Sequence, residues 1–225
     1  MLNKKLVGYG TMRKKFPKKV HECHGEEDEF HMDPRIQQMD DRLLLLNLYL
    51  TQIITLVIGV ISYYFIYFRH GIPLASFFTQ GKGWLFIVGW ALSLGILILL
   101  IEVLLVYLLP PSYFDDGGIN ELLFCDRSLW HIVIIVAVVA FCEEFLFRLI
   151  LQNQIGLWWT SVVFAIIHIR YLAKWVMFTT VFFVSMALGW LYELTGTIIA
   201  PMLTHFVVDL VLAYFIRFDV MKRML

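Results

Sequence analysis

The sequence predicts an all-α fold, a polytopic integral membrane bundle of about six transmembrane helices. The 225 residues are 60% hydrophobic, and the mean hydropathy is +0.76. Soluble domains average only about 45–50% apolar residues, on a wider count that includes glycine. Several apolar runs reach the roughly 20 residues that a helix needs to cross a bilayer. Glycine and proline mark the connections between these runs, as at Pro110-Pro111 and Gly117-Gly118.

Composition divides the chain into a polar tail (1–42), two N-terminal helices with a loop (43–128), a membrane core (129–217) and a short C-terminal tail (218–225). Within these parts, the length of each apolar run and the positions of glycine and proline predict the bounds of the individual helices. We expect them at 43–68, 84–109, 129–152, 157–171, 174–193 and 197–217.

The distribution of charge predicts the orientation of the chain in the cell membrane. Seven of the 18 Lys and Arg residues lie among the first 19 positions, and basic residues favour the cytoplasmic side. Six spans would return the C-terminus to that side, so we expect both termini to be cytoplasmic. We also expect membrane lipids to be partners of the protein. Acidic and basic residues balance at 18 each, so the net charge gives no indication of nucleic-acid binding, and we expect none.

The third predicted helix contains three charged residues: Glu143, Glu144 and Arg148. Each costs about 2.5–3.5 kcal/mol to insert, so such groups are retained where they have partners and a task. Glu144 and Arg148 are four positions apart and therefore share a helix face. Glu143 points about 100° away from Glu144. We therefore expect Arg148 to hold Glu144 and leave Glu143 free to act.

Two other predicted helices carry His168, His205 and Asp209. At about 1.5 Å per residue, these positions reach the same membrane layer as Glu143 and Glu144. Each polar residue alone is most simply explained as a contact between helices. Their common depth favours a shared site. Glu102, Ser161 and Ser185 are interpreted as an interfacial residue and two packing residues.

Two kinds of chemistry fit a glutamate beside two histidines. Glu143 could act as a general base on a trapped water, with His205 donating a hydrogen bond to the developing oxyanion. Alternatively, Glu143, His168 and His205 could bind zinc, with water in the fourth position. The residues by themselves leave both alternatives open.

Three motifs resemble those of a known family. They are Glu-Glu-x-x-x-Arg (Glu143, Glu144, Arg148), Phe-x-x-x-His (Phe164, His168) and His-x-x-x-Asp (His205, Asp209), in this order and each in a predicted span. The set resembles the CAAX protease and bacteriocin-processing (CPBP) family, which includes the type II CAAX prenyl endopeptidases and the Abi proteins. The similarity covers about residues 129–217.

This resemblance implies an intramembrane endopeptidase that cleaves a peptide precursor or a prenylated, membrane-associated protein. Glu143 would be the general base and His168 would help to activate the water, while His205 and Asp209 would line the oxyanion hole. Glu144, Arg148 and Phe164 would support them. We favour a glutamate mechanism without a cofactor, and zinc is the alternative.

Asp209 departs from the prenyl endopeptidases, which carry Asn at this position. An ionised Asp only accepts hydrogen bonds, so it would orient His205 unless it is protonated. Two other functions remain open: a catalytically silent immunity or scaffold protein of the same fold, and a proton-coupled transporter that uses Glu143 or Glu144.

Overall fold

The computed structural model describes residues 41–79, 81–114, 116–172 and 174–220. The predicted N-terminal tail, 1–42, lies outside the described residues except for its last two positions. Residues 221–225 of the predicted C-terminal tail lie outside them as well.

The described part of the chain contains helices and no strand, which confirms the predicted all-α class. Most of these helices are long, and short ones occupy the connections. In chain order they are α2 (Asp41–Ile66), η1 (Phe68–His70), α3 (Ser76–Thr79), α4 (Trp84–Leu108), η2 (Pro111–Tyr113), α5 (Ile119–Phe124), α6 (Leu129–Glu144), η3 (Phe145–Gln152), α7 (Asn153–Ile167), η4 (Ile169–Tyr171), α8 (Trp175–Thr195) and α9 (Ile199–Arg217).

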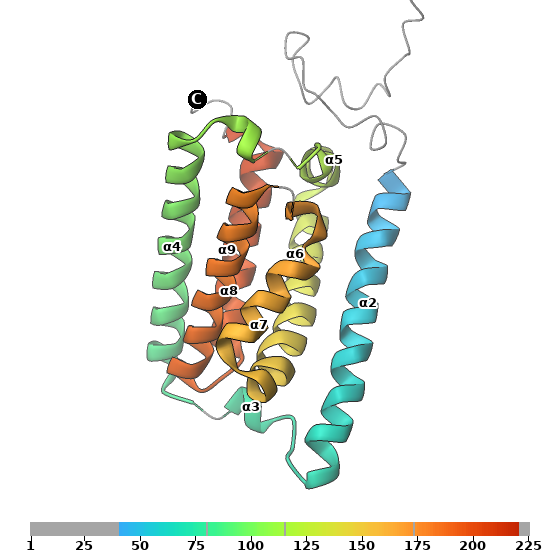
Figure 1. The fold of residues 1–225 in the computed structure, drawn as a ribbon, viewed down its shortest axis with the longest axis vertical. Coiled ribbons are helices and arrows are strands. Elements are labelled where there is room, and N and C mark those ends of the chain that lie inside the picture. The colour runs from blue at the N-terminus through green and yellow to red at the C-terminus, as the bar shows by residue number, and fades with distance from the viewer. Residues whose placement is uncertain (1–40, 80, 115, 173, 221–225) are drawn as a thin grey trace, which may run out of the picture.

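The long helices form one bundle, with α2 and α4 on opposite sides and the other long helices between them (Figure 1). Helix α9 packs against α4, α6 and α8, while α7 packs against α8. Helix α2 contacts α6 and η3. The short helices α5 and α3 lie at opposite ends of the bundle (Figure 1).

Four helical segments in the described ranges are long and apolar enough to cross a membrane: Arg42–His70, Trp84–Leu108, Trp175–Thr195 and Ile199–Arg217. They are consistent with the predicted polytopic membrane bundle. The predicted third span is also helical throughout, because α6 continues directly into η3 through helical backbone at Glu144.

The fourth predicted helix, 157–171, is shorter than expected. Gly156 has φ 78° and ψ 167°, which breaks the helix before Leu157, and α7 ends at Ile167. The unbroken part therefore rises only about 16 Å, roughly half the thickness of the hydrocarbon core. The prediction of a helix through residue 171 was wrong because His168 leaves the helical backbone region, with φ −77° and ψ 57°.

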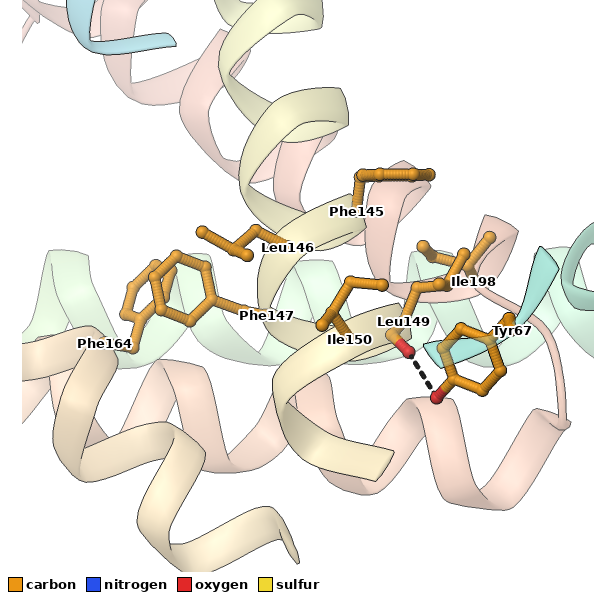
Figure 2. Close-up of a cluster of buried hydrophobic side chains, with 8 residues drawn as sticks. All are labelled: Tyr67, Phe145, Leu146, Phe147, Leu149, Ile150, Phe164 and Ile198. Atoms are coloured by element: carbon orange, nitrogen blue, oxygen red, sulfur yellow. Dashed lines mark hydrogen bonds between the residues drawn. The ribbon is translucent and has the colours of Figure 1, made fainter. Parts of the chain in front are cut away.

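Segment η3 is a π-helix, a wider helix that often occurs at functional sites. All of its residues except Leu151 are buried, and their apolar side chains form a core between neighbouring helices (Figure 2). Tyr67 anchors this segment to the end of α2, because its hydroxyl donates to the carbonyl of Leu149 at 3.1 Å. The π-helix begins directly after Glu143 and Glu144. Packing of this core therefore sets the position of both glutamates along the bundle.

Candidate active site

Glu144 is the centre of a buried polar network. Its side chain is fully buried, and its Oε2 accepts a hydrogen bond from Nε of Arg148 at 2.8 Å. Its other oxygen, Oε1, lies 2.9 Å from Nδ1 of His205 on α9. The predicted pairing of Arg148 with Glu144 is thus confirmed, and Glu143 takes no part in it.

Arg148 extends this network to α8. Its Nη2 donates to the hydroxyl of Ser185 at 3.1 Å, and its guanidinium lies 5.5 Å from the centre of the Phe164 ring. The interpretation of Ser185 as a simple packing residue was therefore wrong. No spacing rule joins positions 148 and 185, so the only available signal was a hydroxyl in an apolar helix near an expected buried charge.

His205 has a carboxylate oxygen near each ring nitrogen. Nδ1 faces Glu144, and Nε2 lies 3.3 Å from Oδ2 of Asp209, one helical turn further along α9. An imidazolium has two N–H donors and matches two carboxylate acceptors. Asp209 is therefore placed to orient His205, as an ionised carboxylate would.

His168 caps the end of α7 and is half-buried. Its Nδ1 lies 2.7 Å from the carbonyl oxygen of Phe164. A carbonyl can only accept, so Nδ1 carries the proton, and Nε2 of the neutral ring keeps its lone pair. The ring also lies against Phe164 and Tyr171, with centroid distances of 4.6 Å and 6.0 Å. These contacts hold one basic nitrogen in a fixed position.

Glu143 points away from the buried ion pair and is half-buried. Its Oε1 accepts a hydrogen bond from Nε2 of Gln52 at 3.2 Å. Gln52 comes from α2 and was not among the residues singled out in the sequence. A polar amide inside an apolar span was the available signal, since such side chains usually bond to a neighbouring helix.

A cavity of about 800 Å³ brings the predicted residues together. Glu143, His168, His205 and Asp209 all line it. The remaining wall is largely apolar and comes from several helices, including α2, α4 and α8. Four residues of α5 also line the cavity, and α5 lies at one end of the bundle (Figure 1). Neither Glu144 nor Arg148 is among the residues that line it.

Glu102 also lines this cavity, from α4. Its Oε2 is buried and has no hydrogen-bond partner among residues 41–79, 81–114, 116–172 and 174–220. Glu102 therefore faces the cavity inside the bundle, and its expected place near the membrane interface stays a prediction.

The residues proposed as zinc ligands do not fit that role in this arrangement. Zinc needs a free nitrogen from each histidine, whereas both nitrogens of His205 lie within hydrogen-bonding distance of carboxylates. Over the part of the chain that the structure describes, no three His, Cys, Asp or Glu residues are grouped so that they could hold a metal ion.

Comparison with known proteins agrees with the motifs at this cavity. The family model of the type II CAAX prenyl endopeptidase Rce1-like proteins matches residues 126–211. The chain is also 42% identical over 137 residues to the uncharacterized protein YpbD of Bacillus subtilis (strain 168), a match that covers 61% of this chain and 72% of YpbD. No solved structure matches the chain significantly.

The matched segment contains the glutamate pair and both histidines, and it runs from just before α6 into α9. Four apolar helices and a buried Glu/His site are what a protease that works inside a membrane requires. The chain belongs to the Rce1-like family of type II CAAX prenyl endopeptidases, which are membrane proteases.

Proposed function

We propose that the protein is an intramembrane endopeptidase in which Glu143 acts as the general base. The strongest support is that the two adjacent glutamates, Glu143 and Glu144, have different surroundings. Both oxygens of Glu144 are occupied by Arg148 and His205, whereas Glu143 lines the cavity. His168 lines the same cavity and keeps one basic nitrogen.

The proposed reaction begins with a water molecule between Glu143 and His168. Glu143 takes one proton from this water, and the lone pair of His168 Nε2 accepts a hydrogen bond from the other. The water oxygen attacks the peptide carbonyl carbon, and the carbonyl π electrons move to its oxygen. Collapse of the tetrahedral intermediate breaks the C–N bond. Glu143 returns its proton to the leaving nitrogen, so that an acid and an amine are released.

The developing oxyanion requires a hydrogen-bond donor, and His205 is the side chain we assign to this task. Its Nδ1 is committed to Glu144, which leaves the Nε2 side of the ring facing Asp209 and the cavity. The 3.3 Å contact with Asp209 would orient the ring, and the Nε2 N–H would then be shared between Asp209 and the developing oxyanion. No step of the mechanism requires a cofactor.

The largely apolar cavity favours a substrate that is itself held at the membrane. A lipid-modified protein end or an apolar peptide precursor would bury its own apolar surface there, whereas a hydrated loop would have to be stripped of water. If the basic N-terminus faces the cytoplasm, the end of the bundle where α5 lines the cavity does too, because α2 begins at that end (Figure 1). Such a substrate would be cleaved near the cytoplasmic surface.

The test compares membrane-bound and released peptides from cells with the wild-type protein and with Glu143→Gln, which keeps the shape of the side chain and removes the base. Exposed Glu193 on α8 provides a matched control as Glu193→Gln. We expect specific cleavage products to disappear with Glu143→Gln alone, at equal protein levels. An unchanged set of peptides would contradict the proposal and favour a silent immunity or scaffold protein. Uptake coupled to pH would favour a transporter instead.

A further inference from the structure

Gln52 of α2 reaches from outside the family-matched segment into the candidate site. The match covers residues 126–211, and α2 ends at Ile66. The Gln52 residue is only 7% exposed, and its Nε2 donates to Oε1 of Glu143 at 3.2 Å. Over the described ranges, Oε2 of Glu143 has no hydrogen-bond partner. Oε1 of the proposed base is therefore hydrogen-bonded to Gln52, while Oε2 can accept a proton.

The orientation of the Gln52 amide is fixed by Glu143. A carboxylate only accepts hydrogen bonds, so the amide must present its NH₂ group and turn its oxygen away. That oxygen, Oε1, is buried and has no partner in the described part of the chain. A buried polar atom without a partner destabilises a fold. An apolar side chain here would avoid this cost but would remove the donor to Glu143, so the amide at position 52 serves that one contact.

Two neighbouring polar residues of α2 behave differently, although they line the same cavity. Thr51 donates to the carbonyl of Leu48, and Thr55 donates to the carbonyl of Thr51. Both hydroxyls are thus satisfied within their own helix. Gln52 instead bonds across to α6, at the position of the proposed base.

We propose that Gln52 is a positioning residue for peptide hydrolysis. It holds Oε1 of Glu143 so that Oε2 is the oxygen that takes the proton from the attacking water. Gln52 itself does not touch the reacting atoms. This inference rests on the proposed endopeptidase function, and it makes α2 part of the machinery although the family match does not include that helix.

The test uses purified full-length protein and two variants of this residue. Gln52→Leu keeps the approximate volume and removes the donor, while Gln52→Met keeps the length of the side chain and also lacks the donor. Thr55→Val is the matched control, because it removes a hydroxyl from the same cavity wall without touching Glu143. The probe is a synthetic quenched peptide with a sequence that is cleaved in wild-type membranes and not in Glu143→Gln membranes.

We expect kcat to fall by about 10²-fold in both Gln52 variants, because misplacing a catalytic group by about 1 Å costs that much. KM should stay within about twofold, since Gln52 orients the base and does not bind the substrate. The melting temperature of Gln52→Leu should stay close to that of the wild type, because removal of the unpartnered amide oxygen offsets the lost hydrogen bond to Glu143. Thr55→Val should keep normal kinetics.

Three outcomes would contradict either the role of Gln52 or the proposed endopeptidase function, and the measurements distinguish them. Unchanged kcat in Gln52→Leu, alongside an inactive Glu143→Gln, would overturn the role of Gln52 and leave the proposed function standing. A lower melting temperature that accounts for the lost activity would assign Gln52 a structural role only. If wild-type and Glu143→Gln membranes cleave the same peptides, so that no such probe exists, the endopeptidase proposal itself is overturned.

Discussion

Nδ1 of His205 lies 2.9 Å from Oε1 of Glu144, a contact that joins residues 61 positions apart in the chain. The same carboxylate holds Arg148, and Arg148 in turn reaches Ser185. One buried glutamate thus connects the end of α6, the π-helix, α8 and α9 behind the cavity. The neighbouring residue, Glu143, lines the cavity and makes none of these contacts.

Glu144→Gln should therefore destabilise the protein, in contrast to Glu143→Gln. It leaves the fully buried Arg148 without its counter-charge, and removing one partner of a buried ion pair typically costs about 3–5 kcal/mol. Thermal unfolding in detergent should show a clearly lower melting temperature for Glu144→Gln and a nearly unchanged one for Glu143→Gln. Equal melting temperatures for the two variants would contradict this assignment.

Gly189→Ala should also destabilise the protein. Gly189 lies where α8 approaches Gln152 and Leu157, and a Cβ atom there would overlap both side chains. Its carbonyl also accepts a hydrogen bond from Nε2 of Gln152 at 2.9 Å, so the helices have little room to separate. Overpacking of this kind typically costs about 1–3 kcal/mol, which outweighs the roughly 1 kcal/mol that alanine gains over glycine in a helix.

Gly89→Ala is the control for this prediction. Gly89 lies within α4, and a Cβ atom there would meet nothing within 4 Å. Alanine also favours the helix over glycine by about 1 kcal/mol. Unfolding measurements should show a stable Gly89→Ala and a weakened Gly189→Ala. Similar stability in the two variants would show that the α8 contact is looser than the structure indicates.

Substitutions of Asp209 by asparagine and by leucine should have different effects on cleavage. Asparagine can still accept from Nε2 of His205 through its carbonyl, and its NH₂ can donate to an oxyanion. Leucine can do neither. We expect Asp209→Asn to keep kcat within about tenfold, whereas Asp209→Leu should lose about 10²–10³-fold, the cost of losing one oxyanion-stabilising donor. Cleavage kinetics with the same peptide probe would distinguish them, and full activity of Asp209→Leu would show that His205 needs no partner.

The sequence predicted those parts of the molecule that local rules determine. Apolar run length located the long helices, and i,i+4 spacing predicted both the Glu144–Arg148 and the His205–Asp209 contacts. The end of α7 was mispredicted because apolar residues continue past His168 while the backbone does not. Composition alone does not encode that change of backbone direction.

The contacts that sequence reasoning missed are those between distant helices. Gln52 and Glu143 are separated by 91 positions, and Arg148 and Ser185 by 37. Periodicity shows which residues share one face of a helix, but not which face meets which neighbour. The rotation of α2 and α8 about their axes decides both contacts, and it is set by packing of the whole bundle.

The final prediction concerns metal. A catalytic zinc ion needs three side-chain ligands, each with a free lone pair, together with a bound water. His205 lies between Glu144 and Asp209, so binding zinc would require one of these two contacts to break. We therefore expect chelators to leave cleavage of the peptide probe unchanged and metal analysis of the purified protein to find no stoichiometric zinc. Loss of activity with a chelator and its recovery with added zinc would show that His205 turns away from Glu144 or Asp209 to bind the ion, and the glutamate mechanism would then have to be abandoned.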